Sequence, residues 1–234
     1  KMLLHVVSLE SEDPILDYQT ILDELKQYDE TLLKRERWVI LSKKDLADEP
    51  HIDHIVKELE KLNINLGTVF LCAGWYATLA TMIFESGVKV DKIRSFDIDE
   101  STVEIAEIFN KPWFVDQWKF KALVDDIMDI NYTEHNWQYW SKSNNRMSRI
   151  ITDNPDTIVN TSCEHIENFI EWYAKIPEGK LVILQSNDYE DVDEHVNTAA
   201  SLFDFAMQTP MSEVLFSGEL SLVNYSRFMR IGFK

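Results

Sequence analysis

The run at positions 160–165 carries more kinds of reactive side chain than any other short stretch of the sequence. It offers an amide, two hydroxyls, a thiol, a carboxylate and an imidazole, beginning at the last residue of the predicted strand 156–160. Polar groups packed this closely behind a buried strand are costly unless they face a cavity or cap a helix. Thr161 or Ser162 could provide such a cap. Alternatively, these polar groups face a substrate.

Three residues of this run are candidates for catalysis, namely Asn160, Glu164 and His165. Carboxylate and imidazole side chains are the commonest general bases in enzymes, so Glu164 or His165 could take a proton from a substrate. Cys163 is a weaker candidate as a nucleophile, because no base partner is identifiable and cysteine more often packs than reacts. We therefore expect Asn160, Glu164 and His165 to face a substrate.

A second group of candidates forms a tight turn between a predicted strand and a predicted helix. Residues 68–73 are apolar, and Gly74, Trp75 and Tyr76 follow them. A small turn with glycine lets a ligand approach the backbone and meet the positive end of a helix. Because only one glycine is present, an ordinary tight turn with two core aromatic residues explains the pattern equally well.

Acidic residues follow the next two predicted strands. Asp97 comes after Gly74 at close to the roughly 20-residue spacing of dinucleotide-binding motifs, where an acid binds ribose hydroxyls. Asp99 is placed to cap the next helix. Asp126 either reaches an adenine amino group or belongs to a solvated acidic turn. This spacing indicates a nucleoside ligand.

The elements that must position these residues alternate between strand and helix. Apolar runs separated by helical spacing predict an α/β fold: a Rossmann-like, doubly wound, mostly parallel sheet with a C-terminal antiparallel hairpin at residues 213–219 and 227–233. Right-handed crossovers bring the carboxyl ends of parallel strands to one edge, where ligands bind. Residues 131–149 show no clear period and predict a loop or an irregular hairpin.

Composition narrows the range of partners. The formal net charge is -18, which disfavours nucleic-acid and membrane partners and favours a small-molecule substrate. The two cysteines show no metal-ligand spacing, so we expect no metal site, and packed thiols fit a cytoplasmic location. No apolar run reaches the roughly 18 to 20 residues that a membrane span needs. Composition leaves the oligomeric state and the acceptor open.

The order of these features resembles the class I S-adenosylmethionine (SAM)-dependent methyltransferases. Residues 72–76 stand where that family's glycine-rich loop holds the methionine moiety, Asp97 where its ribose-binding acid lies, and Asp126 where its adenine-contacting acid lies. Residues 160–165 stand at its fourth motif. More narrowly, residues 67–234 resemble methyltransferase-like proteins of tailed phages in the phrases CAGWYATL, IRSFDID, NTSCEHI and GELSL.

This resemblance implies SAM as the cofactor and methyl transfer to a small molecule or nucleotide. The implied cofactor-binding residues are Cys72, Ala73, Gly74, Trp75, Tyr76, Asp97, Asp126 and Asn160. The chain departs from the family by lacking the second and third glycines of the loop. A non-catalytic nucleotide-binding or structural α/β module is the alternative, and it is favoured if Trp75 or Tyr76 fills the space for the methionine tail.

The start of the chain resembles a different family. Residues 1–60 are similar to part of the G domain of the Obg GTPases, whose guanine-reading motif would be Ser42, Lys43, Lys44 and Asp45 here. The chain has no phosphate-binding G-x-x-x-x-G-K-[S/T] loop, so GTP hydrolysis lacks an electrostatic basis. A residual guanine-binding fragment is therefore a third, weaker hypothesis.

We expect two domains, a βαβα segment at residues 1–62 and a methyltransferase-like Rossmann domain at residues 63–234. The sequence near position 62 has no Gly- or Pro-rich linker, which favours a first segment that adds its strands to one continuous sheet. Two unrelated resemblances in one chain indicate a natural gene fusion, a recombinant or an engineered chimera.

Overall fold

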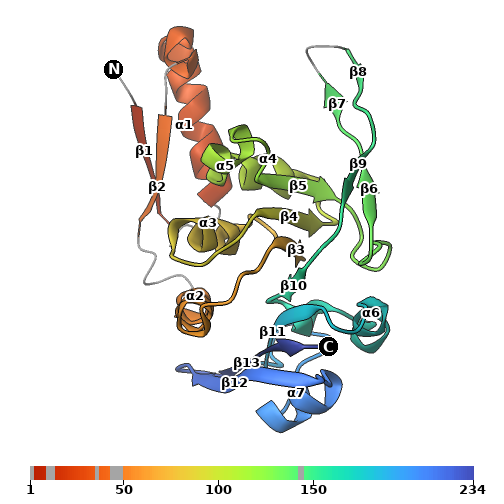
Figure 1. Cartoon of the computed structure of the whole chain (residues 1–234). Coiled ribbons are helices and arrows are strands. Elements are labelled where there is room, and N and C mark those ends of the chain that lie inside the picture. The colour runs from red at the N-terminus through yellow and green to blue at the C-terminus, as the bar shows by residue number, and fades with distance from the viewer. Residues whose placement is uncertain (1–2, 9–13, 35–36, 43–49, 142–144) are drawn as a thin grey trace. The chain divides into compact units, whose positions relative to one another are not determined.

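The structure, a computed structural model of the chain, divides into two compact units, Lys1–Asp53 and His54–Lys234 (Figure 1). It describes residues 3–8, 14–34, 37–42, 50–141 and 145–234.

The first unit holds two parallel strands joined through a helix. β1 (Leu3–Ser8) pairs with β2 (Arg37–Ser42), and α1 (Pro14–Tyr28) and the 3-10 helix η1 (Glu30–Lys34) connect them. The expectation that these strands extend the main sheet is wrong, because β1 and β2 form a sheet of their own and the larger sheet ends at β12 and β5. Lys43, Lys44 and Asp45 of the guanine-reading motif lie outside the described residues.

The second unit is built on a seven-stranded sheet of order β12-β13-β11-β10-β3-β4-β5. Its strands are β3 (Thr68–Cys72), β4 (Lys92–Asp97), β5 (Phe120–Val124), β10 (Thr157–Asn160), β11 (Leu181–Asn187), β12 (Glu213–Ser221) and β13 (Ser226–Phe233). The first five run parallel, and β13 pairs antiparallel with both β11 and β12. The predicted Rossmann-like fold with a closing hairpin is confirmed.

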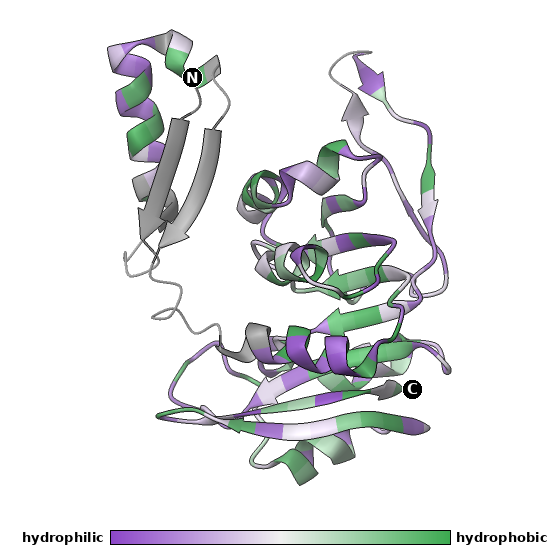
Figure 2. Cartoon of the chain, turned by 60° about the vertical axis from the view of Figure 1, so that its left-hand side comes forward, coloured by the Kyte–Doolittle hydropathy of each residue, from purple (hydrophilic) through white to green (hydrophobic). Residues whose placement is uncertain are grey.

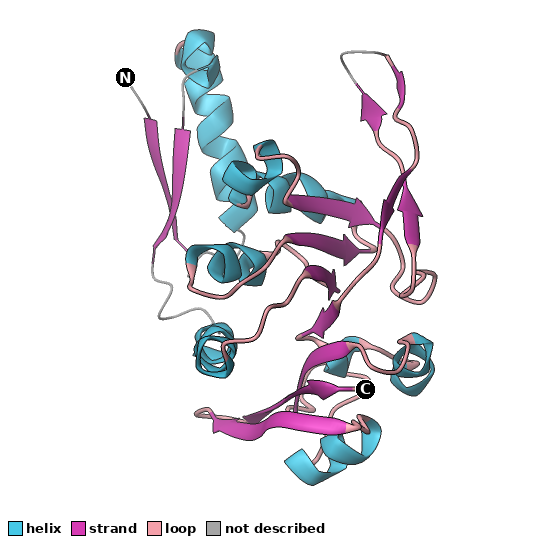
Figure 3. Cartoon of the chain, in the orientation of Figure 1, coloured by secondary structure: helices cyan, strands magenta, loops and turns pink. Residues whose placement is uncertain are grey.

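Helix α2 (Pro50–Leu62) precedes this sheet in the chain, and further helices connect its strands (Figure 3). These are α3 (Thr78–Glu85), α4 (Glu100–Phe109), α5 (Lys111–Val115), α6 (Phe169–Lys175) and α7 (Leu202–Gln208), with a 3-10 turn η2 (Cys163–His165). In α2, buried Ile55, Val56 and Leu59 recur at helical spacing, and Figure 2 shows this helix striped in hydrophobic and hydrophilic colours. The sequence did not predict α7, which begins where Ser201 accepts a hydrogen bond from the backbone N–H of Asp204.

A ribbon hairpin follows β5 and confirms the hairpin alternative for residues 131–149. It consists of β6 (His135–Trp137), β7 (Trp140–Ser141), β8 (Arg146–Met147) and β9 (Ile151–Asp153), with β6 paired to β9 and β7 to β8. Buried Asp153 connects the base of this hairpin to β4. It accepts hydrogen bonds from Lys92, from Arg94 Nε at 2.6 Å and from Trp137 Nε1 at 2.8 Å. Burial opposes ionisation of Asp153, but the hydrogen bond from Lys92 and the Arg94 charge outweigh it and lower the pKa.

A cavity of about 780 Å³ lies beside this hairpin. Lys92, at the first position of β4, lines it together with Arg94, Trp118 and Tyr139. The predicted site residues instead follow the last positions of the strands, so this cavity does not belong to the predicted site. Among the described residues, no helix combines the length and the apolar character that a membrane span requires.

The order of the strands places a switch point between β3 and β10. From β3 the chain proceeds to β4 and β5 on one side, and it later returns to lay down β10 and β11 on the other. The register pairs Cys72, the last residue of β3, with Asn160, the last residue of β10. The segments that follow these two strands therefore leave the sheet side by side, where doubly wound proteins bind their ligands.

Candidate functional site

The turn between β3 and α3 has three alternating residues in the left-handed region that glycine normally occupies. Ala73, Trp75 and Ala77 have φ angles of 50°, 47° and 54°. A residue with a side chain costs about 1–2 kcal/mol in this region. Such strain persists only where the surrounding fold imposes it, and it gathers at functional sites.

Gly74 has a different reason to be glycine. It lies outside the left-handed region, but a Cβ at this position would come within 2.1 Å of Ser95 Oγ on the neighbouring strand β4. The turn therefore has glycine where a side chain of β4 packs closely against it, and other residues at the three positions with left-handed backbone angles.

Asp97, the last residue of β4, holds this turn in place. Its Oδ2 accepts a hydrogen bond from Trp75 N at 2.9 Å, and its Oδ1 accepts one from Asp99 N at 3.0 Å. A carboxylate has about four acceptor positions, so Asp97 can still accept bonds from two ribose hydroxyls. The predicted cap at Asp99 is confirmed, because Asp99 Oδ1 accepts from Ser101 N at 2.9 Å, and hydrogen bonding with Ser101 lowers the pKa of Asp99.

The two aromatic residues of the turn stack on each other. Trp75 is 60% exposed and stacks on Tyr76, with 4.0 Å between ring centroids. Tyr76 in turn packs edge-on against Phe109 of α4. The interpretation of Trp75 as a core residue is therefore wrong, and its ring stands where a ligand above the turn could contact it.

The remaining cofactor candidates contribute less through their side chains. Asp126 is exposed, and its Oδ1 accepts from Met128 N at 2.8 Å, as in the acidic-turn interpretation. The Cys72 thiol lies in the core, 3.6 Å from Tyr132 Oη, and burial raises its pKa to about 12. Burial also raises the pKa of Cys163 well above its usual value, so neither cysteine is suited to act as a nucleophile.

Asn160 shapes the turn after β10. Its side chain is fully buried, and its Oδ1 accepts a hydrogen bond from Ser162 N at 2.9 Å. Ser162 occupies the N-cap position of η2 but forms no side-chain cap bond, so the structure does not support the cap interpretation for Ser162. Within the described part of the chain, Asn160 Nδ2 has no hydrogen-bond partner.

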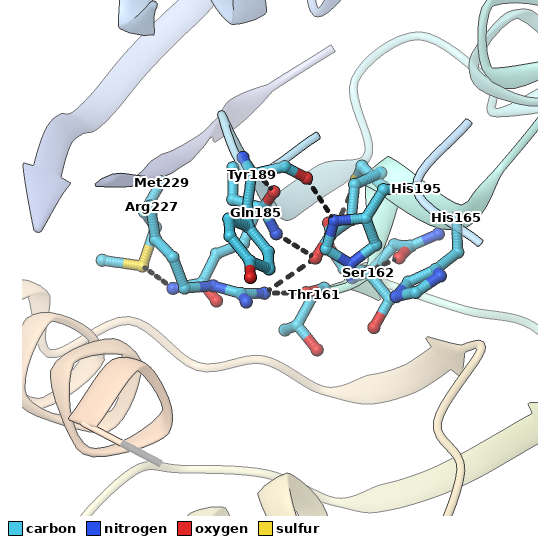
Figure 4. Close-up of polar contacts among 12 residues, drawn as sticks. Thr161, Ser162, His165, Gln185, Tyr189, His195, Arg227 and Met229 are labelled. Atoms are coloured by element: carbon cyan, nitrogen blue, oxygen red, sulfur yellow. Dashed lines mark hydrogen bonds and ion pairs between the residues drawn. The ribbon is translucent and has the colours of Figure 1, made fainter. Parts of the chain in front are cut away.

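Glu164 is buried in a polar network that the sequence did not predict. Its Oε1 accepts from Asn187 Nδ2 at 2.7 Å and lies 3.3 Å from Arg227 Nη2, which also donates to Thr161 O at 2.8 Å (Figure 4). Asn187 and Arg227 are paired in register on β11 and β13. Strand β11 and the antiparallel strand β13 therefore supply the partners of Glu164, and only knowledge of the register between these two strands could have revealed them.

His165 is exposed and meets a second histidine that sequence reasoning missed. The rings of His165 and His195 are edge-to-face with 4.7 Å between centroids, and Figure 4 shows them side by side. His165 Nδ1 lies 3.1 Å from Glu194 O, and His195 Nδ1 lies 2.5 Å from Tyr189 O. The structure thus places Asn160 at the end of β10 and Glu164 and His165 just after it, with Asn160 and Glu164 buried and His165 at the surface.

Sequence comparison confirms the resemblance to Obg GTPases over part of the chain. The GTPase Obg of Prochlorococcus marinus (strain MIT 9515) is 46% identical over 63 residues, which is 27% of this chain and 19% of that protein. The GTPase Obg of Microcystis aeruginosa (strain NIES-843) is 40% identical over 84 residues, 36% of this chain and 24% of that protein. The chain therefore matches only about a fifth to a quarter of the length of these relatives. No family model matches it.

Several solved structures with the same fold are methyltransferases. The N-methyltransferase NodS of Bradyrhizobium japonicum WM9 superposes with a TM-score of 0.54 at 11% identity, covering 80% of this chain and 98% of that one. The small RNA methyltransferase HEN1 gives 0.57 at 13% identity, covering 82% and 26%. Magnesium protoporphyrin IX methyltransferase ChlM of Synechocystis PCC 6803, with bound SAM, gives 0.50 at 13% identity, covering 80% of each chain. The chain thus shares its Rossmann-like fold with these methyltransferases.

Proposed function

We propose that the chain binds SAM over the turn at residues 73–77 and transfers its methyl group to a small molecule or nucleotide held near residues 160–165. The observation that carries this proposal is the left-handed backbone of Ala73, Trp75 and Ala77, bonded through Trp75 N to Asp97. A strained turn lowers the stability of the fold, so its place beside the acid of the next strand favours a role in ligand binding.

Each half of the sheet edge has its own role in this proposal. Asp97 binds the ribose, Asp126 lies toward the adenine, and the backbone of the turn holds the methionine moiety. ChlM, which has the same fold, carries SAM in its solved structure, and a NodS structure carries S-adenosylhomocysteine. Asn160, Glu164 and His165 face the acceptor, because their turn leaves the sheet beside the turn after β3.

The chemistry is an in-line displacement at the sulfonium methyl. A lone pair of the acceptor forms a bond to the methyl carbon while the carbon–sulfur bond breaks, and its electrons neutralise the sulfonium to give S-adenosylhomocysteine. The protein needs mainly to position the acceptor and to assist loss of its proton. That assistance falls to the ionisable residues after β10.

We further propose that this domain occupies residues 63–234 and that residues 1–62 are an Obg-like segment joined to it by gene fusion. The segment lacks a phosphate-binding loop, so we expect it to contribute no GTP hydrolysis.

Thermal unfolding of the whole chain with ligands tests the cofactor. SAM or S-adenosylhomocysteine at about 100 times its Kd should add roughly 2.7 kcal/mol, a shift of roughly 5–10 °C for a chain of this size. The Asp97→Asn variant should lose most of the shift. The Asp99→Asn variant is the matched control and should keep it, because asparagine caps helices as well as aspartate does. If neither ligand shifts the wild-type midpoint at millimolar concentration, the chain is a non-catalytic module.

A further inference from the structure

Glu164, His165 and His195 bring three potential metal-ligand atoms together. One carboxylate oxygen and one ring nitrogen from each histidine all lie within 4.8 Å of one another. Residues 160–165 and the loop after β11 both lie at the carboxyl edge of the sheet. We propose that these residues bind a divalent first-row transition-metal ion, against the expectation from the sequence that no metal site exists.

The Glu164 carboxylate is held in place through one of its two oxygens. Its Oε1 is held by Asn187 and Arg227, whereas Oε2 is buried and has no hydrogen-bond partner in the described residues. The residue is only 2% exposed. A buried carboxylate oxygen without a partner is costly, and a cation bound to Oε2 would offset that cost.

Both histidines are oriented as metal ligands usually are. In each ring, Nδ1 lies against a backbone carbonyl, that of Glu194 for His165 and that of Tyr189 for His195. A ring that donates from Nδ1 to a carbonyl keeps its lone pair on Nε2, the usual way in which proteins set the tautomer of a metal-binding histidine. The free Nε2 atoms are then available to coordinate an ion.

The loop that carries His195 is fastened to the segment that carries the other two ligands. Asn197 N donates to Glu164 O at 2.8 Å, and Asn197 Nδ2 donates to Cys163 O at 3.2 Å. Ala199 N also donates to the backbone oxygen of Asn187 at 2.9 Å, and the side chain of Asn187 holds the Glu164 carboxylate. These bonds hold the loop close to η2 and limit the movement needed to complete a site.

The donor set selects the kind of ion. Two imidazoles and one carboxylate suit Mn²⁺, Fe²⁺, Co²⁺ or Zn²⁺, whereas Mg²⁺ and Ca²⁺ prefer oxygen ligands. Arg227 offsets part of the charge of Glu164, which further disfavours ions that depend on negative charge. Three protein ligands would leave at least one coordination position for water or for an acceptor atom.

The use of such an ion rests on the proposed methyl transfer, although binding of the ion does not. An acceptor hydroxyl coordinated to the ion would have a lower pKa and release its proton to solvent. The resulting oxygen lone pair would form the bond to the methyl carbon as the carbon–sulfur bond breaks. His165 would then act as a ligand, in place of a base.

Titration of the chelator-treated full chain with Co²⁺, without SAM, tests the site by the visible absorption of the bound ion. We expect one tight site, from which Zn²⁺ displaces Co²⁺ and Mg²⁺ at the same concentration does not. The variants His165→Ala and His195→Ala should each weaken Co²⁺ binding by more than about 10-fold, since loss of even an outer-shell partner costs roughly that much. Because these side chains are not fully buried, we expect both variants to keep the wild-type far-UV circular dichroism.

The matched control is His54→Ala, which removes a histidine from outside the group and should leave the Co²⁺ affinity unchanged. The proposal is overturned if the wild type binds Co²⁺ no more tightly than the His165→Ala and His195→Ala variants. It is also overturned if Mg²⁺ displaces Co²⁺ as effectively as Zn²⁺, because the acidic surface would then explain the binding. Co²⁺ binding without any SAM-dependent stabilisation would uphold the metal site and contradict the proposed function alone.

Discussion

The two halves of the carboxyl edge of the sheet are built in opposite ways. After β3 and β4, a turn exposes the side chain of Trp75, and one carboxylate, Asp97, holds the shape of the turn. After β10 and β11, buried side chains form a network around Glu164. On the proposed function, the first half would bind the cofactor and the second would bind the methyl acceptor.

This contrast shows where a turn can have left-handed backbone angles without glycine. The turn keeps its left-handed backbone at Ala73, Trp75 and Ala77 although none of them is glycine. Each such residue costs about 1–2 kcal/mol, which a large fold can offset elsewhere. A buried ion pair does not tolerate substitution in this way, because removal of one partner leaves the charge of the other buried and unpaired.

The largest effect should come from the buried half. Replacement of Glu164 by alanine leaves Arg227 buried beside the space of its partner, so we expect the free energy of unfolding in urea to fall by about 3–5 kcal/mol. Glu194→Ala is the matched control, since that side chain is exposed, and its effect should stay within about 0.5 kcal/mol. A loss below about 1 kcal/mol for Glu164→Ala would remove the proposed contrast between the halves.

An intermediate effect is expected at the one glycine of the turn. Gly74→Ala would place a Cβ against Ser95 Oγ, and we expect the midpoint of urea unfolding to fall by an amount equivalent to about 1–3 kcal/mol. The control Gly87→Ala should be tolerated, since the nearest atom lies at 3.7 Å. Adding Ser95→Ala should rescue part of the loss; no rescue would show that Ser95 is not the obstacle.

The smallest predicted effect is a gain in stability. Ala77→Gly relieves a left-handed residue, and after allowance for the greater freedom of glycine in the unfolded chain we expect a stabilisation of about 0.5–1 kcal/mol. Ala80→Gly in the adjoining helix α3 should instead destabilise the chain by about 1 kcal/mol or more. If both variants lose stability equally in thermal unfolding, the turn is not strained at Ala77.

Much of the fold could be predicted because apolar runs and helical spacing are local signals. The strands predicted at residues 68–73 and 180–185 illustrate this, since they correspond to β3 and β11, which are buried along their whole lengths. Local signals do not say which strand pairs with which. The sheet that β1 and β2 form by themselves was therefore missed. Helix α7 was missed because it buries one residue, Phe205, whereas α6, a helix of the same length, buries three residues at helical spacing.

The candidate site was predicted in part for the same reason. Asn160, Glu164 and His165 follow a strand directly, so their common location was readable from the sequence. His195 and Arg227 reach them through a loop and through the register of an antiparallel pair, which are long-range features. The roles of Asp97 and Asp126 stay predictions until a ligand is bound.

A crystal structure of the chain with S-adenosylhomocysteine tests the central claim most directly. The proposal predicts the ligand over residues 73–77, with its ribose hydroxyls within about 3.2 Å of the Asp97 carboxylate. Trp75 and Asp126 should flank it, and the turn should keep its left-handed angles. Crystals grown with millimolar ligand that hold it elsewhere, or that show the Trp75 ring lying in its place, would contradict the account.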